Sequence, residues 1–157
     1  MTEAIDAGVE IELPPLIAVM TQSSDRMKEY GADQMHADFI VKDLLPQMED
    51  LLPVIREPSA RAIMGASFGA VASLSTAWRH PGVFGKLFLQ SGSFVFTDIG
   101  DHDRPPMFDP VVKFVNQFRK KPGRPADQVF LSCGVYESLI YYNRSLVPLL
   151  QETGMQV

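Results

Sequence analysis

Short apolar runs alternate with longer amphipathic stretches along the whole chain. The runs of strand length lie at residues 16–20, 61–64, 86–90 and 129–133. The stretches in which apolar residues recur every three or four positions, as on one face of a helix, lie at 34–52, 68–80, 109–121 and 138–153. Largely apolar strands that alternate with helices are typical of a parallel sheet with helices on both faces. The pattern therefore predicts a single α/β domain over residues 1–157, without repeats or linkers.

Proline, glycine and aspartate mark the ends and interruptions of these elements. Pro46 lies inside the first helical stretch, and because proline has no N–H to donate we expect a kink or a restart there. Asp109 followed by Pro110 predicts a capped start for the third helical stretch. Gly154 closes the fourth stretch, and residues 155–157 after it look like the start of another strand.

Composition and charge narrow the classes of function. The chain has 14 Lys and Arg against 19 Asp and Glu, so its net charge of −5 argues against a nucleic-acid partner. No apolar run approaches the ~20 residues of a membrane-spanning helix, so no membrane partner is expected. Residues 1–13 lack the basic start of a signal peptide, which leaves the cytoplasm as the default location. The single cysteine, Cys133, excludes an internal disulfide and is expected to be a small buried apolar residue.

The segment Gly65-Ala66-Ser67-Phe68-Gly69 matches the pattern G-x-S-x-G between a predicted strand and a predicted helix. In serine hydrolases this spacing places the serine at the apex of a tight strand-to-helix turn. We expect both glycines to be required, because a Cβ at either position would collide as the chain doubles back. Ser67 is then the nucleophile, and the N–H of Phe68 is an oxyanion-hole donor at the start of the helix. The alternative is that Ser67 only caps the helix.

Three blocks of the sequence resemble the enterochelin-esterase-like (putative esterase) family of α/β-hydrolases. The central block is RAIMGASFGAVASLSTAWRHPGVFGKLFLQSGSF, which includes the motif. The upstream block comprises ELPPLIAVM and DFIVKDLLPQM, and the downstream block is VFLSCGVYESLIYYNRSLVPLLQETGMQV. The resemblance implies an α/β-hydrolase-type, mostly parallel sheet and a Ser–acid–His triad that hydrolyses a carboxylic ester without a cofactor. It is compatible with either a siderophore-type ester or a small acyl ester as substrate.

The resemblance also implies which residues form the triad. Ser67 corresponds to the nucleophile, and Glu137, after the strand at 129–133, corresponds to the acid. Apart from the triad, Glu137 could simply complement the positive end of the following helix. The competing carboxylates are easier to interpret as loop or cap residues: Asp98, Asp101, Asp103 and Asp109.

No histidine follows the acid, although the order of the triad requires one there. The three histidines of the chain all precede it: His36, His80 and His102. We therefore expect the catalytic histidine, on a loop after a strand that begins near Met155, and the second oxyanion donor to lie outside the 157 residues. The domain would then lack its N-terminal strands and its C-terminal strand with the histidine loop. His102 stands between two aspartates, but sequence neighbours rarely face one ion together, so no metal is expected.

The sequence thus predicts a serine esterase domain that acts on a small-molecule ester with a histidine from beyond the chain. Two other functions stay open. The first is an acyltransferase on the same scaffold, in which an alcohol replaces water. The second is a non-catalytic binding domain that lacks the histidine. Because outer strands are expected to be absent, we also expect an exposed sheet edge, which favours homo-oligomers.

Overall fold

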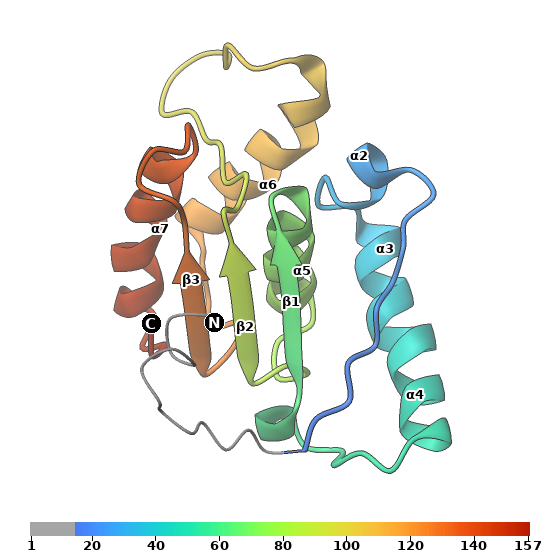
Figure 1. Ribbon diagram of the computed structural model, residues 1–157. Helices are drawn as coiled ribbons and strands as arrows, with labels where there is room; N and C mark the ends of the chain where they lie inside the picture. The colour runs from blue at the N-terminus through green and yellow to red at the C-terminus, as the bar shows by residue number, and fades with distance from the viewer. Residues whose placement is uncertain (1–14) are drawn as a thin grey trace, which may run out of the picture.

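The computed structural model describes residues 15–157, which are built on a three-stranded parallel sheet (Figure 1). The strands are β1 (Ala62–Ala66), β2 (Lys86–Gln90) and β3 (Gln128–Ser132), in the order β1-β2-β3. Their last residues lie level with one another, because Ala66 pairs with Gln90 and Gln90 with Ser132. The three loops that follow the strands therefore all start at one edge of the sheet, the edge formed by the carboxyl ends of the strands.

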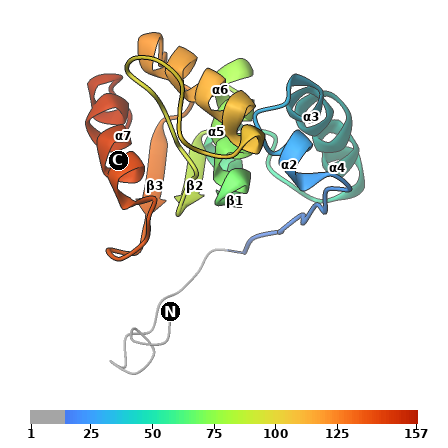
Figure 2. The ribbon, with the colours of Figure 1, turned by 90° about the horizontal axis from the view of Figure 1, so that it is seen from above.

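Helices connect the strands and lie mainly behind the sheet (Figure 2). The α-helices are α2 (Arg26–Glu29), α3 (Gln34–Asp38), α4 (Leu45–Leu51), α5 (Phe68–Arg79), α6 (Asp109–Lys120) and α7 (Ile140–Glu152). A π-helix, η1 (Phe39–Leu44), joins α3 to α4, and two 3-10 turns are η2 (Pro58–Ala60) and η3 (Pro106–Phe108). No helix of residues 15–157 is long and apolar enough to cross a membrane.

The core lies between the sheet and helices α5 and α6. Leu87 and Leu89 of β2 point into it and are buried, and the α5 face is made of small side chains that let the helix approach closely. Phe114 and Phe118 of α6 are buried and belong to the same core. This packing accounts for the apolar spacing that predicted both helices.

The opposite face of the sheet is exposed in the described chain. Met64, Phe88 and Phe130 pair in register across it and are 68%, 39% and 62% exposed. The α/β class and the parallel strands are confirmed. Helices on both faces were expected, however, whereas the helices of residues 15–157 leave this face uncovered.

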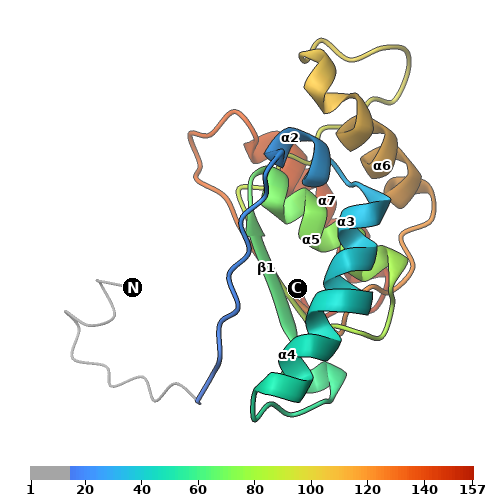
Figure 3. The ribbon, with the colours of Figure 1, turned by 90° about the vertical axis from the view of Figure 1, so that its right-hand side faces the viewer.

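The prediction of a strand at residues 16–20 is wrong. This segment rises past β1 toward α2 without regular secondary structure (Figure 3), and Leu16 and Met20 are 70% and 92% exposed. The apolar run predicts burial, which Leu16 and Met20 do not show in the described chain. A strand also needs a hydrogen-bonded neighbour, and no backbone hydrogen bond joins this segment to another part of residues 15–157.

The helical stretch predicted at 34–52 forms, with the interruption expected at Pro46. Asp33 caps its start by accepting from the N–H groups of Met35 and His36. The chain widens into the π-helix just before the proline, where the N–H of Leu45 donates to the carbonyl of Ile40. A π-turn at this point accommodates the hydrogen bond that proline cannot make.

The last residues of the chain start to pair with β3, as the sequence predicts. The N–H of Val129 donates to the Gln156 carbonyl at 2.7 Å, and Gln156 forms a parallel bridge with Gln128. Gly154, with a φ of 81°, makes the turn out of α7 that brings this segment back to the sheet.

Candidate active site

Ser67 occupies a sharp turn between β1 and α5. Its φ of 55° and ψ of −121° lie in a region that residues other than glycine rarely adopt. Backbone hydrogen bonds on both sides hold this conformation: the Ser67 N–H donates to the Gln90 carbonyl at 3.0 Å, and the Ser67 carbonyl accepts from the N–H of Ala70. The side chain of Ser67 makes no capping bond to the helix. The geometry is therefore that of a strained strand-to-helix turn rather than of a helix cap.

The two glycines of the motif differ in what they contribute. A Cβ on Gly65 would lie 2.1 Å from the Gly69 carbonyl oxygen and 2.7 Å from the Ala70 nitrogen, so only glycine fits there. A Cβ on Gly69 would meet nothing within 4 Å. The expectation of a collision at both positions is thus correct for Gly65 and wrong for Gly69, because it is the Gly65 side of the turn that the helix backbone crosses.

Phe68 begins α5 directly after the serine. Its N–H lies in the first turn of the helix, so no helix carbonyl accepts a hydrogen bond from it. Its side chain is buried and meets the ring of Phe108 edge-on, with 5.1 Å between ring centroids. The loop inserted after β2, which ends at Phe108, therefore reaches the serine turn.

Glu137 lies in the loop between β3 and α7, at the same edge of the sheet as Ser67. Its Oε1 accepts from the Ser91 hydroxyl and from the Gly134 N–H, each at 2.8 Å. The Ser91 hydroxyl first, and then the Gly134 N–H, hold the pKa of Glu137 below its usual value. The carboxylate therefore points back toward the ends of the strands and stays ionised. Its hydrogen-bond donors are Ser91 and Gly134 and not the first N–H groups of α7, so the alternative role at the start of that helix does not fit.

The competing carboxylates are all exposed, and three of them lie in the polar insertion: Asp98, Asp101 and Asp103. The fourth, Asp109, does not cap α6 as expected. Asp109 is the first residue of that helix, and its carboxylate instead accepts from Nε2 of His102 at 3.0 Å. No hydrogen bond of the described chain connects any of the four to Ser67.

None of the three histidines hydrogen-bonds to Ser67 or Glu137 in residues 15–157. His36 lies on α3 with its Nδ1 3.9 Å from Glu29, and burial lowers the pKa of its imidazole. His80 follows the far end of α5 and pairs with Asp38 at 2.9 Å. The three histidines are therefore engaged elsewhere, as their positions before Glu137 predict.

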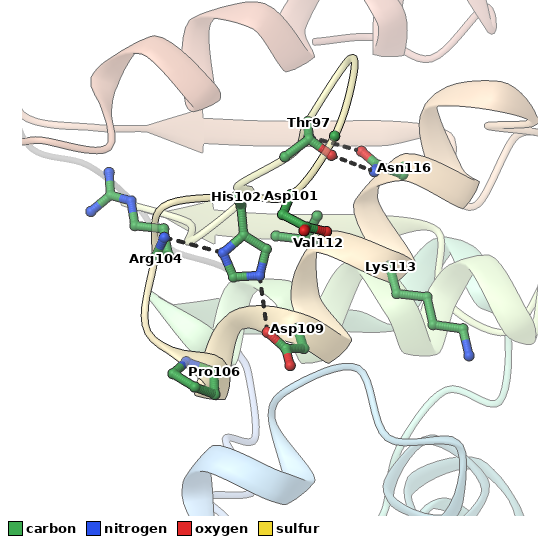
Figure 4. A pocket seen from close by; sticks show the side chains of 10 residues that line it. Thr97, Asp101, His102, Arg104, Pro106, Asp109, Val112, Lys113 and Asn116 are labelled. Atoms are coloured by element: carbon green, nitrogen blue, oxygen red, sulfur yellow. Dashed lines mark hydrogen bonds and ion pairs between the residues drawn. The ribbon is translucent and has the colours of Figure 1, made fainter.

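The polar insertion forms a cavity of about 540 Å³ with α6 (Figure 4). Thr97 and Asn116 bridge its two walls with two hydrogen bonds of 3.2 Å. Both ring nitrogens of His102 are used, since Nδ1 accepts from the Arg104 N–H while Nε2 faces Asp109. Neither Ser67 nor Glu137 lines this cavity. No group of three His, Cys, Asp or Glu side chains in the described chain is arranged to hold a metal ion.

Cys133 follows β3 and is half-buried rather than buried as expected. Burial raises the pKa of its thiol, and the negative charge of Glu137 raises it further. Such a thiol is a poor nucleophile at neutral pH, which leaves Ser67 as the nucleophile candidate at this edge.

Sequence reasoning missed three residues that surround the candidate pair. Ser91 contacts Glu137, and Ser93 has its Oγ 3.2 Å from Oγ of Ser67. Asn143 of α7 is fully buried and bonds the backbone between these two serines. The available signal was the position of Ser91 and Ser93 directly after an apolar strand, where loops of parallel sheets carry functional groups.

A strained serine between a parallel strand and a helix, at the carboxyl end of a parallel sheet, is the arrangement of the α/β-hydrolase class of fold. Residues 10–154 match the family described as "Putative esterase". The chain therefore belongs to this family.

Individual relatives agree with this assignment. The iron(III) enterobactin esterase of Dickeya dadantii (strain 3937) is 28% identical over 146 residues, covering 82% of this chain and 34% of that protein. The crystal structure of the enterobactin esterase from Shigella flexneri with 2,3-dihydroxy-N-benzoyl-glycine has a TM-score of 0.67 at 19% identity, covering 85% of this chain and 34% of that one. A ferulic acid esterase has a TM-score of 0.60 at 20% identity, covering 76% of this chain and 50% of that one. These structures share the fold, and the chain spans about a third of the length of the two enterobactin esterases.

Proposed function

We propose that this chain carries the nucleophile, the acid and one oxyanion donor of a serine esterase. The observation that carries the proposal is the strained turn of Ser67 at the carboxyl end of β1, with Glu137 held ionised at the same edge. Ser67 Oγ would attack the ester carbonyl, and the N–H of Phe68 would stabilise the oxyanion that forms. Glu137 would orient a histidine and stabilise its imidazolium.

The histidine of the proposed triad is not one of the three in the chain. Such a histidine accepts the proton of Ser67 during attack and then gives it to the leaving alcohol. We place it outside residues 1–157, because the order of the triad requires it after Glu137. The substrate we propose is a carboxylic ester. The named relatives favour a siderophore-type ester, and a small acyl ester is the other candidate.

The first experiment measures p-nitrophenyl ester hydrolysis by the 157-residue chain with and without Ser67→Ala. We expect no difference, because loss of the triad histidine lowers turnover on the order of 10⁶-fold in subtilisin. Hydrolysis that depends on Ser67 in this chain would mean that a residue within it serves as the base, and the proposed histidine would be wrong.

The second experiment repeats the assay on the same chain with the residues that its reading frame encodes on either side. Here we expect hydrolysis that Ser67→Ala abolishes and that Glu137→Gln lowers strongly. If Ser67→Ala has no effect in this form, the esterase proposal fails and the non-catalytic binding domain becomes the better description. If an alcohol acceptor speeds release of p-nitrophenol and accumulates as its ester, the acyltransferase is supported.

A further inference from the structure

The turn Ser91-Gly92-Ser93 lies between the candidate nucleophile and the candidate acid. It begins directly after the last residue of β2, the central strand, so it has the serine turn on one side and the Glu137 loop on the other. Ser93 is 2% exposed, yet nothing in the proposed triad uses either of its polar groups.

On the nucleophile side, Ser93 contacts Ser67 through two atoms. Its N–H donates to the Ser67 carbonyl at 3.2 Å, and the two hydroxyl oxygens lie 3.2 Å apart. Because Ser93 is buried, few water molecules compete for this contact. The backbone bond supports the strained conformation of Ser67, and the hydroxyl contact acts on the nucleophilic oxygen itself.

On the acid side, Ser91 takes the corresponding role. Its hydroxyl donates to Glu137 Oε1 at 2.8 Å, and its N–H donates to the carbonyl of Ser132 at 2.7 Å. The φ of Ser91 is 44°, which is positive like that of Ser67 and is uncommon in a residue other than glycine. Backbone strain thus occurs on both sides of the pair, at Ser67 and at Ser91.

Asn143 fixes the middle of the turn. Its side chain is fully buried, accepts from the Gly92 N–H at 3.1 Å and donates to the Gly92 carbonyl at 2.8 Å. A Cβ on Gly92 would lie 2.0 Å from the ring of Phe94, so the turn has no room to shift toward that ring. A paired amide and a buried ring therefore hold the two serines at a constant separation.

We infer that Ser91-Gly92-Ser93 is a positioning element that couples the nucleophile to the acid, with Ser93 orienting Oγ of Ser67 and Ser91 orienting the carboxylate of Glu137. This inference rests on the proposed function. When Ser67 gives its proton to the base, Ser93 keeps its own proton and donates a hydrogen bond to the developing alkoxide. The same donation stabilises Oγ when it leaves the acyl group during deacylation.

The test uses two readouts that need no catalytic base. The first is the pKa of the Glu137 carboxyl, followed by carbon NMR in the otherwise unchanged chain. The second is the pH dependence of iodoacetamide alkylation of the thiol introduced by Ser67→Cys, in a Cys133→Ala background so that only this thiol reacts. A hydroxyl that donates to the thiolate lowers its pKa.

Each serine is expected to affect one readout. Ser91→Ala should raise the pKa of Glu137 toward its usual value and leave the alkylation profile unchanged. Ser93→Ala should raise the thiol pKa, slow alkylation at neutral pH roughly two- to fourfold and leave Glu137 unchanged. This crossed pattern would support the positioning role.

Other patterns would overturn the inference. If Ser93→Ala leaves the thiol pKa unchanged, or Ser91→Ala leaves the carboxyl pKa unchanged, the corresponding hydroxyl does not act on its neighbour. If either variant changes both readouts, the turn is a general structural support and not a pair of specific contacts. Because neither readout measures hydrolysis, these failures are distinct from failure of the esterase proposal, which the Ser67→Ala assay detects.

Discussion

The two glycines of the serine turn should respond in opposite directions to the same substitution. In Gly65→Ala the new methyl group would lie 2.1 and 2.2 Å from the carbonyl oxygen and carbon of Gly69, and both atoms belong to the backbone of α5. No side-chain rotation can relieve this overlap, so the helix or the strand has to move. Overpacking costs typically 1–3 kcal/mol, and we expect about 3 kcal/mol here.

Gly69→Ala is the matched control, because its methyl group would enter open space within the same turn. An alanine restricts the unfolded chain and favours the helix, so we expect a gain of about 0.5–1 kcal/mol. The assay is urea unfolding followed by the fluorescence of Trp78, the one tryptophan of the chain. Trp78 donates to the Lys121 carbonyl at 3.0 Å and packs on Phe114, so it reports on the α5–α6 contact. A Gly65→Ala variant within about 0.5 kcal/mol of the unmodified chain would refute the steric argument.

Three further predictions concern stability and association. Burial lowers the pKa of His36, so the folded chain favours the neutral imidazole. The contribution of His36 to the free energy of unfolding is therefore full at pH values above the usual histidine pKa and is lost as the pH falls. In urea unfolding between pH 7 and 5, His36→Gln should reduce this loss of stability. Asn143→Asp would set a carboxylate against the carbonyls of Gly92 and Leu139, which now accept from the amide. Protonation relieves this repulsion, so the variant should gain stability relative to the unmodified chain as the pH falls. The same pH dependence of stability in both chains would contradict the buried amide contacts. Phe130 is 62% exposed in the uncovered apolar face of the sheet, and such a face favours association between copies of the chain. Phe130→Glu should therefore lower the average mass measured by sedimentation velocity. An unmodified chain that is already monomeric would contradict the expected association.

The strand and helix positions around the motif could be predicted because each is determined by short-range pattern. The apolar run of β2 and the three- and four-residue spacing of apolar residues in α6 each predict which side chains of that element are buried. The run at 16–20 shows where this reasoning ends. Apolar residues predict burial from sequence alone, but a strand also needs a neighbouring strand to pair with, and that strand can come from any part of a chain.

The nucleophile could be predicted for the same local reason, whereas its surroundings could not. Ser67 stands inside a five-residue pattern, but Ser93 and Asn143 contribute through contacts 26 and 51 residues apart in the chain. Only the order and register of the strands bring such residues together. The free space beside Gly69 could not be predicted either, because it depends on the path of the α5 backbone, which passes close to Gly65 and not to the Cβ position of Gly69.

Register is what makes these separate loops one site. The three strands have five residues each and end level, so Ser67 and Ser91 are the first residues beyond their strands at the same height of the sheet. A strand advances by roughly 3.3 Å per residue, so a one-residue shift in the pairing register of β2 would displace the Ser91 turn by about the length of a hydrogen bond. It would also turn the apolar face of β2 outward, because successive side chains point to opposite faces. The packing of Leu87 and Leu89 against α5 therefore selects the same register that brings Ser93 to Ser67. In this fold the burial that stabilises the sheet and the geometry of the candidate site have a single cause.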